Sequence, residues 1–233
     1  MNTINRVFIT GDTHGKFDKI HSLCEKLETT KDDVIIILGD AGINYSGKTD
    51  QYLKSALQKM PITFFCIHGN HEKRPESIDS YNISEFCGGK VYIEDSYPNL
   101  IFAKDGEIYD FNGKKYIVIG GAYSVDKFYR LMRGWNWFAD EQPSEKTKKL
   151  IEEKLQSLDW SIHGVLSHTC PRKYEPIEVF LPMIDQSSVD KSTEDWLDQI
   201  EDKLTYNKWY CGHYHTNKSI DKLRFMFDDI DLL

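Results

Sequence analysis

Five short runs of β-branched and aromatic residues recur along this chain, and each is followed by a residue type that can bind metal. The runs cover residues 7–10, 34–38, 62–67, 165–167 and 209–211, and the residues that follow are Asp12, Asp40, Asn70, His168 and His213. Continuous apolar runs of this length are typical of strands buried on both faces, as in parallel sheets. Apolar residues at helical spacing separate several of the runs, near residues 20–27, 53–60, 150–155 and 196–204. This alternation predicts an α/β fold with parallel pairing in part of the sheet.

The middle of the chain follows a different pattern. Residues 108–111 and 116–119 are two strand-like runs with Asn112-Gly113 between them, which is a strong signal of a tight hairpin turn. Helical spacing follows Ser144, a residue type favoured at helix N-caps, and also follows Thr193. We therefore expect two mixed sheets, packed together and flanked by helices.

Composition is that of an ordinary globular protein, with 40% hydrophobic and 28% charged residues over 233 positions. Because no repeat or linker interrupts the sequence, we expect one domain over residues 1–233, with an insertion-like recognition loop at about 121–143. The five cysteines are odd in number and form no Cys-x-x-Cys pair, which favours reduced thiols and a cytoplasmic location. We see neither a signal peptide at the polar start of the chain nor an apolar run long enough to span a membrane.

The formal net charge of −8 restricts the class of partner. Avid binding to extended nucleic acid depends on clustered Lys and Arg, so this balance disfavours it. A phosphorylated small molecule, a nucleotide or a phosphopeptide remains compatible, because bound divalent cations would add positive charge where the phosphate sits.

Metal-ligand residue types gather at the ends of the five predicted strands. They are Asp12, His14, Asp40, Asn70, His71, His168, His213 and His215. Open α/β sheets bind ligands at the carboxyl ends of their strands, so these side chains should meet. Taken alone, each fragment could be a turn, a helix cap or a structural histidine. Together, and in this order, they favour a catalytic metal centre.

The chemistry of phosphate-ester hydrolysis explains these residue types. Two metal ions about 3.5–4 Å apart lower the pKa of a shared water and cover the charge on the phosphoryl oxygens. Mixed oxygen and imidazole ligands suit Mn, Fe or Zn, and the absence of cysteine from these positions argues against a structural zinc site. His213 and His215 would face one site if their segment is extended, because alternate residues then point the same way.

These motifs resemble those of the calcineurin-like metallophosphoesterase family. The matching pieces are Gly-Asp-Thr-His-Gly at 11–15, Gly-Asp at 39–40, Gly-Asn-His-Glu at 69–72, His168, and Gly-His-Tyr-His at 212–215. The resemblance implies a four-layer α/β/β/α sandwich with two divalent metal ions, Mn²⁺ being favoured, at the edge of the two sheets. It implies that one ion is held by Asp12, His14, Asp40 and His215, and the other by Asp40, Asn70, His168 and His213. It also implies that His71 stabilises the transition state or protonates the leaving oxygen.

The resemblance predicts a hydrolase that cleaves a phosphomonoester or phosphodiester with a metal-bound hydroxide. Two alternatives are a protein Ser/Thr phosphatase of the same fold and an inactive scaffold that only binds partners. Phosphoprotein phosphatases carry an Asp three residues after the second motif and then an Arg, whereas Ala41 to Asn44 occupy these positions here. The Asp that would orient His71 is therefore missing, and this disfavours the phosphoprotein alternative. An inactive scaffold usually loses ligands, and this chain keeps all of them.

Three arginines are candidates for contacting the substrate phosphate. Arg74 follows the motif that contains His71, while Arg130 and Arg133 lie in the 121–143 segment. Each could equally be a solvated surface charge. In the same segment Trp135 and Trp137 could stack on a substrate ring, but we favour a role in sealing the core beneath the loop.

Overall fold

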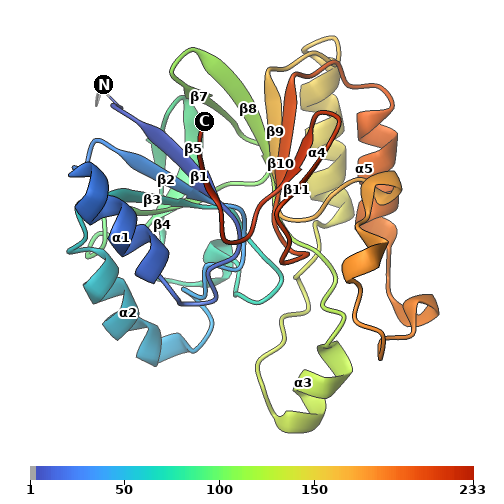
Figure 1. The fold of residues 1–233 in the computed structure, drawn as a ribbon, viewed down its shortest axis with the longest axis horizontal. Coiled ribbons are helices and arrows are strands. Elements are labelled where there is room, and N and C mark those ends of the chain that lie inside the picture. Colours follow the sequence, from blue (N-terminus) through green and yellow to red (C-terminus); the bar gives the residue numbers. More distant parts are fainter. Residues whose placement is uncertain (1–3) are drawn as a thin grey trace.

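The computed structural model describes residues 4–233, in which two sheets pack face to face (Figure 1). In this part of the chain the larger sheet has seven strands in the order β13-β1-β2-β3-β6-β5-β4, and the smaller has six in the order β11-β12-β10-β9-β8-β7. The larger sheet contains β1 (Val7–Thr10), β2 (Val34–Ile37), β3 (Thr63–Cys66), β4 (Asn82–Phe86), β5 (Gly89–Ile93), β6 (Leu100–Ala103) and β13 (Ile230–Leu232). The smaller contains β7 (Ile108–Phe111), β8 (Lys114–Ile119), β9 (Gly164–Ser167), β10 (Lys208–Cys211), β11 (Lys218–Ile220) and β12 (Leu223–Phe225).

Both sheets are mixed, as predicted. The strands β1, β2, β3 and β6 run parallel to one another, and so do β8, β9, β10 and β12, whereas β13, β5, β4, β7 and β11 pair in the antiparallel sense. The Asn-Gly prediction is confirmed: β7 and β8 form a hairpin in which Asn112 and Gly113 have φ values of 56° and 84°. Two positive φ values are what a two-residue turn needs to match the twist of its strands.

Helices cover the outer face of each sheet (Figure 1). The helices α1 (Asp18–Leu27) and α2 (Asp50–Leu57) lie on the larger sheet, and α4 (Glu145–Gln156) and α5 (Ser192–Glu201) lie on the smaller. The predicted N-cap is confirmed, because the Ser144 hydroxyl accepts a hydrogen bond from the Thr147 N–H at 3.2 Å. The helix expected after Thr193 is α5, which begins at Ser192. Thr193 therefore lies inside the first turn of α5, and its hydroxyl donates to Gln142.

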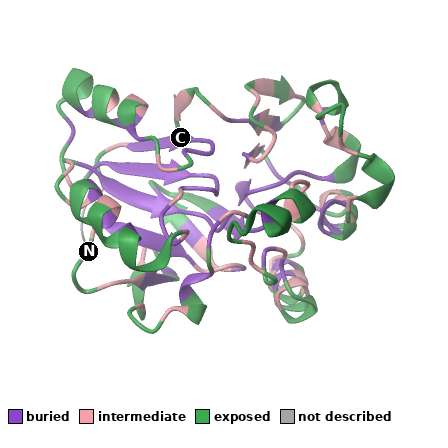
Figure 2. Cartoon of the chain, turned by 90° about the horizontal axis from the view of Figure 1, so that it is seen from below, coloured by how far each residue is buried: buried purple, intermediate pink, exposed green. Residues whose placement is uncertain are grey.

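Strand alternation divides the core into three apolar clusters. Ile9 packs between the two sheets with Leu166, while its neighbour Phe8 points to the opposite face and packs with Ile20 of α1. On the smaller sheet Ile117 packs with Ile151 of α4. Three packed interfaces separate four layers, so the predicted α/β/β/α sandwich is confirmed. Figure 2 shows the strands buried in purple and the outer faces of the helices exposed in green.

The 121–143 segment projects from the sandwich and contains a short helix, α3 (Lys127–Arg133) (Figure 1). Our expectation that its tryptophans seal the core was wrong. Trp135 is 51% exposed. Trp137 is only partly buried, and its indole N–H donates to Glu141 at 2.7 Å. Aromatic residues in a segment without helical or strand periodicity do not reveal which of them face the solvent.

Two further predictions concern the whole chain. Across the described residues, no helix combines the length and the apolar composition needed to cross a membrane. One domain over residues 1–233 stays a prediction, and its first three residues, together with part of the expected polar start of the chain, lie outside the described residues.

Candidate metal centre

The ends of five parallel strands bring the predicted ligands together. The connections after β1, β2 and β3 of the larger sheet meet those after β9 and β10 of the smaller sheet. Ligand atoms of Asp12, His14 and His215 all lie within 4.8 Å of one another, and so do those of Asp12, Asp40 and His168. Parallel strands present their carboxyl ends at one edge, which is why residues far apart in sequence converge here.

The first group of ligand atoms surrounds an orphaned carboxylate oxygen. The Nε2 atoms of His14 and His215 lie 2.9 Å apart, and Asp12 Oδ2 lies 3.3 Å from that of His215. Asp12 Oδ1 accepts the backbone N–H of His213, whereas the buried Oδ2 has no hydrogen-bond partner within residues 4–233. A buried oxygen without a partner is costly, and a bound cation would satisfy it.

Beside the second group, His168 and Asn70 bring two hydrogen-bond acceptors face to face. His168 Nδ1–H donates to the carbonyl oxygen of Leu38 at 2.7 Å, and in the neutral ring this leaves a lone pair on Nε2. That nitrogen lies 2.8 Å from Asn70 Oδ1, whose amide is oriented by donation from its Nδ2 to Ser124 Oγ. Two lone pairs at this distance repel each other unless a cation lies between them. A ligating histidine that donates its other N–H to a carbonyl is also the usual arrangement around a metal.

The backbone of the site is strained in a consistent way. His14, Asp40, His213 and His215 all have left-handed conformations, with φ values of 47°, 48°, 67° and 48°. Strained conformations cluster at ligand sites, where surrounding contacts hold them. A Cβ atom on Gly69 would lie only 2.0 Å from Asp40 Oδ1, so this position has to be glycine for the carboxylate to come so close.

Our reason for placing His213 and His215 on one face was wrong. The residues form a turn after β10, and they are not extended. Their rings consequently reach different groups: the His213 ring lies 5.0 Å from that of His168, and the His215 ring lies 4.9 Å from that of His14.

Electrostatics keeps two of the candidate imidazoles neutral, whereas contact with Asp12 raises the pKa of a third, His215. Burial lowers the pKa of His14 and, more strongly, that of His213, so both imidazoles stay neutral. Burial alone would raise the pKa of Asp12, but its contact with His215 and the charges of the nearby histidines hold that pKa below its ordinary value. Neutral imidazoles, ionised carboxylates and unpartnered acceptors together fit divalent cations.

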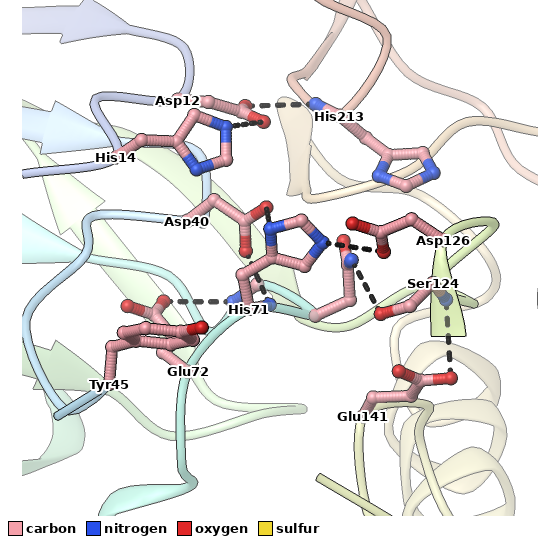
Figure 3. A network of polar contacts seen from close by, with 12 residues as sticks. Asp12, His14, Asp40, Tyr45, His71, Glu72, Ser124, Asp126, Glu141 and His213 are labelled. Carbon is pink, nitrogen blue, oxygen red and sulfur yellow. Dashed lines mark hydrogen bonds and ion pairs between the residues drawn. The ribbon is translucent and has the colours of Figure 1, made fainter. Parts of the chain in front are cut away.

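His71 contacts two side chains of the 121–143 segment, Arg130 and Asp126, and Figure 3 shows Asp126 facing it. Arg130 Nη2 lies 2.6 Å from His71 Nδ1, and Asp126 Oδ1 lies 3.4 Å from His71 Nε2. A guanidinium can only donate, so Nδ1 is the acceptor and the ring proton is on Nε2. The backbone N–H of His71 also donates to Asp40 Oδ1 at 2.8 Å, which ties the histidine to the ligand group.

The three predicted arginines lie in different surroundings. Arg74 is buried, donates from Nη1 to Asp105 at 2.6 Å and from Nε to the carbonyl of Asp140, and these contacts favour a structural role over a phosphate clamp. Arg130 is engaged by Asp126 and His71. Arg133 lies at the exposed end of α3 with its guanidinium over the ring of Tyr129. For all three arginines, contact with the substrate phosphate stays a prediction.

Comparison with known proteins agrees with this geometry. The sequence model of the calcineurin-like phosphoesterases matches residues 5–217. The chain belongs to the calcineurin-like phosphoesterase family. Members of this family use divalent metals, and the ligand groups described above are candidates for holding them. A search of curated proteins found no match.

Two solved structures resemble this calcineurin-like phosphoesterase more distantly. One crystal structure superposes with a TM-score of 0.47 at 11% identity, covering 95% of this chain and 89% of its own. A protein serine/threonine phosphatase from Saccharomyces cerevisiae superposes with a TM-score of 0.35 at 15% identity, covering 97% of this chain and 67% of its own. At these scores neither structure informs substrate or mechanism.

Sequence reasoning missed three residues that support this phosphoesterase centre. Asp126 contacts His71, Ser124 orients Asn70, and buried Glu141 accepts the N–H of Ser124 at 3.2 Å. The available signal was the spacing of Asp126 and Arg130, which are four residues apart on a helix and form an ion pair at 2.8 Å.

Glu72, the last residue of the Gly-Asn-His-Glu motif, is fully buried. Its Oε1 accepts the backbone N–H of Gly69 at 2.9 Å. Burial, and then the charge of Asp40, raises the pKa of Glu72 to about 8, so the side chain is mostly protonated at neutral pH. Its contact with Gly69 supports the turn that carries Asn70 and His71.

Proposed function

We propose that this chain is a metal-dependent hydrolase that cleaves a phosphomonoester or a phosphodiester. The observation that carries the proposal is the facing pair of acceptors, His168 Nε2 and Asn70 Oδ1, 2.8 Å apart in a buried site. A cation between these two atoms would relieve that pairing while His168 donates to Leu38 and Asn70 donates to Ser124.

The family resemblance implies the two ligand sets, and the clustering of the ligand atoms supports them. Asp12, His14, Asp40 and His215 would hold one ion, and Asp40, Asn70, His168 and His213 would hold the other, with Asp40 shared. Mn²⁺ is the favoured ion, and Fe or Zn suits the same donors. When bound, the ions supply an activated water and offset the negative charge of the phosphoryl oxygens.

His71 acts in this proposal by donating a hydrogen bond from Nε2. Burial lowers the pKa of His71, but contacts with Asp126 and Asp40 raise it more, so the net direction is upward. A second proton on Nδ1 would nevertheless require Arg130 to leave, because the guanidinium occupies that lone pair. The arrangement therefore favours stabilisation of transition-state oxygen charge over full proton transfer to the leaving oxygen.

The protein phosphatase and the inactive scaffold differ from the proposed hydrolase in what they cleave. A protein Ser/Thr phosphatase would share the metal centre and cleave phosphopeptides. An inactive scaffold would show metal binding without turnover. We propose a cytoplasmic enzyme whose substrate is a phosphorylated small molecule, a nucleotide or a phosphopeptide rather than extended nucleic acid.

The test begins with protein stripped by chelator and assayed on p-nitrophenyl phosphate and bis-p-nitrophenyl phosphate. Each assay is repeated with Mn²⁺, Zn²⁺, Mg²⁺ and no metal. Restored cleavage of either ester is expected with Mn²⁺, and the preferred ester distinguishes phosphatase from phosphodiesterase. Cleavage that persists in metal-free protein would sink the proposal.

Variants locate the activity in the centre. Asp40→Asn and His213→Ala should lose metal binding and turnover together, because each removes a ligand. His71→Ala should keep both metals, measured by Mn²⁺ titration calorimetry, and lose rate by about 10²-fold or more. Full turnover in Asp40→Asn protein shown to be metal-free would contradict the assignment.

A further inference from the structure

A cavity of about 330 Å³ opens directly onto the candidate metal ligands. Asp40, Asn70, His213 and His215 form one end of it, with His71 beside them. A second wall comes mainly from residues 179–191, in the long connection between β9 and α5. Connections of this length usually carry function, and this volume lies at the lower end of the range for small-molecule sites.

Much of the remaining lining is apolar. Its aliphatic members are Val125, Val179, Leu181, Ile184 and Val189. Two aromatic rings belong to it, since Phe180 and Tyr214 stack with their centroids 6.2 Å apart and their planes 15° apart, and the Tyr214 ring also lies 4.9 Å from that of His213. Leu181 is 58% exposed and Val179 is 39% exposed, so water meets apolar side chains in this wall. An apolar ligand would bury that surface favourably.

The charged groups in the wall are mainly acidic. Hydrogen bonds hold the pKa of Asp126 at about 2 and that of Asp190 below its ordinary value, despite the opposing effect of burial, so both carboxylates are ionised. Among the described residues that line the cavity, Lys191 is the one lysine or arginine, and its Nζ already lies 2.6 Å from Glu175 Oε1. A second phosphate group placed here would meet negative charge without a free cation.

We propose that this cavity binds the organic part of the substrate, and that the substrate is a phosphate ester of an apolar, ring-sized alcohol with no second phosphate. This inference rests on the proposed function, because the phosphoryl group has to lie at the Asp40 end. It separates the substrate from nucleoside di- and triphosphates, because Asp126 and Asp190 would repel their further phosphates. The residues that select the alcohol are then those of the 179–191 wall, with α3 outside it.

The experiment measures binding of uncleavable phosphonates to Mn²⁺-loaded protein by titration calorimetry. Methylphosphonate reports the metal centre alone, and 1-naphthylmethylphosphonate adds a ring of the size of the cavity. We expect the naphthyl compound to bind about 10- to 100-fold tighter, from burial of its apolar surface. A nucleoside diphosphate should gain no such advantage.

A matched pair of variants places the effect in the wall. Leu181→Asp puts a carboxylate into the cavity and should reduce the naphthyl advantage about tenfold, with methylphosphonate affinity changed less than about twofold. Met183→Asp adds the same charge two residues away on a side chain that is 94% exposed and lies outside the lining, so the advantage should persist. Val179→Asp repeats the test if Leu181→Asp does not fold.

The outcomes separate the two proposals. Equal affinity for the two phosphonates, or equal losses in Leu181→Asp and Met183→Asp, overturns the apolar subsite and leaves the metal centre intact. Diphosphate binding as tight as that of the naphthyl compound also overturns it. Failure of Mn²⁺-loaded protein to bind either phosphonate or inorganic phosphate overturns the proposed function, and the subsite with it.

Discussion

Two long connections flank the candidate metal centre, and they differ in chemistry. The connection after β8 contains α3 and sends polar side chains inward, where Asp126 and Arg130 hold His71 and Ser124 holds Asn70. The connection after β9 sends mainly apolar side chains toward the cavity, including those of Val179 and Leu181. Both leave the carboxyl end of a parallel strand of the same sheet.

The difference suggests a division of labour. Directional hydrogen bonds fix the position of a group to fractions of an ångström, which rate requires. Apolar contacts are non-directional and scale with buried area, which suits selection among alcohols of different shape. Changes in the first connection should therefore act on turnover, and changes in the second on substrate preference.

The largest expected effect is on the first connection. Asp126→Asn should lower kcat about 10²-fold with little change in KM, because it weakens the ion pair that holds Arg130 against His71 Nδ1 and leaves the candidate ligands in place. Steady-state kinetics on p-nitrophenyl phosphate measures this. The combined variant with His71→Ala should be no slower than His71→Ala alone. Asp140→Asn is the control, since that carboxylate is exposed in the same segment. Losses that multiply in the combined variant would separate Asp126 from His71.

The next effect concerns the stability of the fold at Glu194, in α5, where the connection after β9 ends. Glu194 lines the cavity, accepts from Thr169 at 2.7 Å through Oε1, and has no described partner for its buried Oε2. Burial raises the pKa of Glu194 to about 7, so its ionisation destabilises the fold as pH rises from about 4.3 to 7.

Glu194→Gln should therefore gain stability relative to the parent over that window, by on the order of 1 kcal/mol per pH unit, and no more above it. Urea unfolding of metal-free protein at pH 5, 6, 7 and 8 measures the difference. A difference that does not change with pH would show that Glu194 does not titrate as described.

A smaller effect is expected at Ser124. Ser124→Ala removes the acceptor of the Asn70 amide and frees that side chain to rotate, so affinity for the second Mn²⁺ should fall about tenfold. Sequential Mn²⁺ titration measures it. Affinity for the first ion should stay within about twofold, and an equal loss at both sites would argue for a general structural change.

The smallest effect tests the exposed side of α3. Met132 is 75% exposed and belongs to none of the contacts that reach His71 or Asn70. Met132→Ser should change stability by less than about 0.5 kcal/mol and leave kcat and KM as they are. A clear change in KM would bring the outer face of α3 into substrate recognition and weaken the division between the connections.

The sequence revealed the two mixed sheets and the clustering of the candidate ligands for a definable reason. Strands buried on both faces leave continuous apolar runs, and the residue after each run is placed by the end of the strand, as at Asp40 and His168. The Asn112-Gly113 turn could be predicted in the same way, from two adjacent residues. All of these features are determined by residues that are close together in the sequence.

The rest depended on contacts between distant segments. His71 and Asp126 are 55 positions apart, and nothing in either local sequence pairs them. The exposure of Trp135 and the inward direction of Leu181 follow from how irregular segments pack, and such segments have no period from which a face can be read. The turn at His213 also had no signal strong enough to replace the extended interpretation.

The proposed ligand sets straddle the boundary between the sheets. Asp12, His14, Asp40 and Asn70 follow strands of the larger sheet, while His168, His213 and His215 follow strands of the smaller. Each ion would therefore cross-link the two sheets of the sandwich in addition to its part in the reaction. Binding that favours the folded chain raises its stability by mass action, so scarcity of metal would reduce the lifetime of the protein along with its activity.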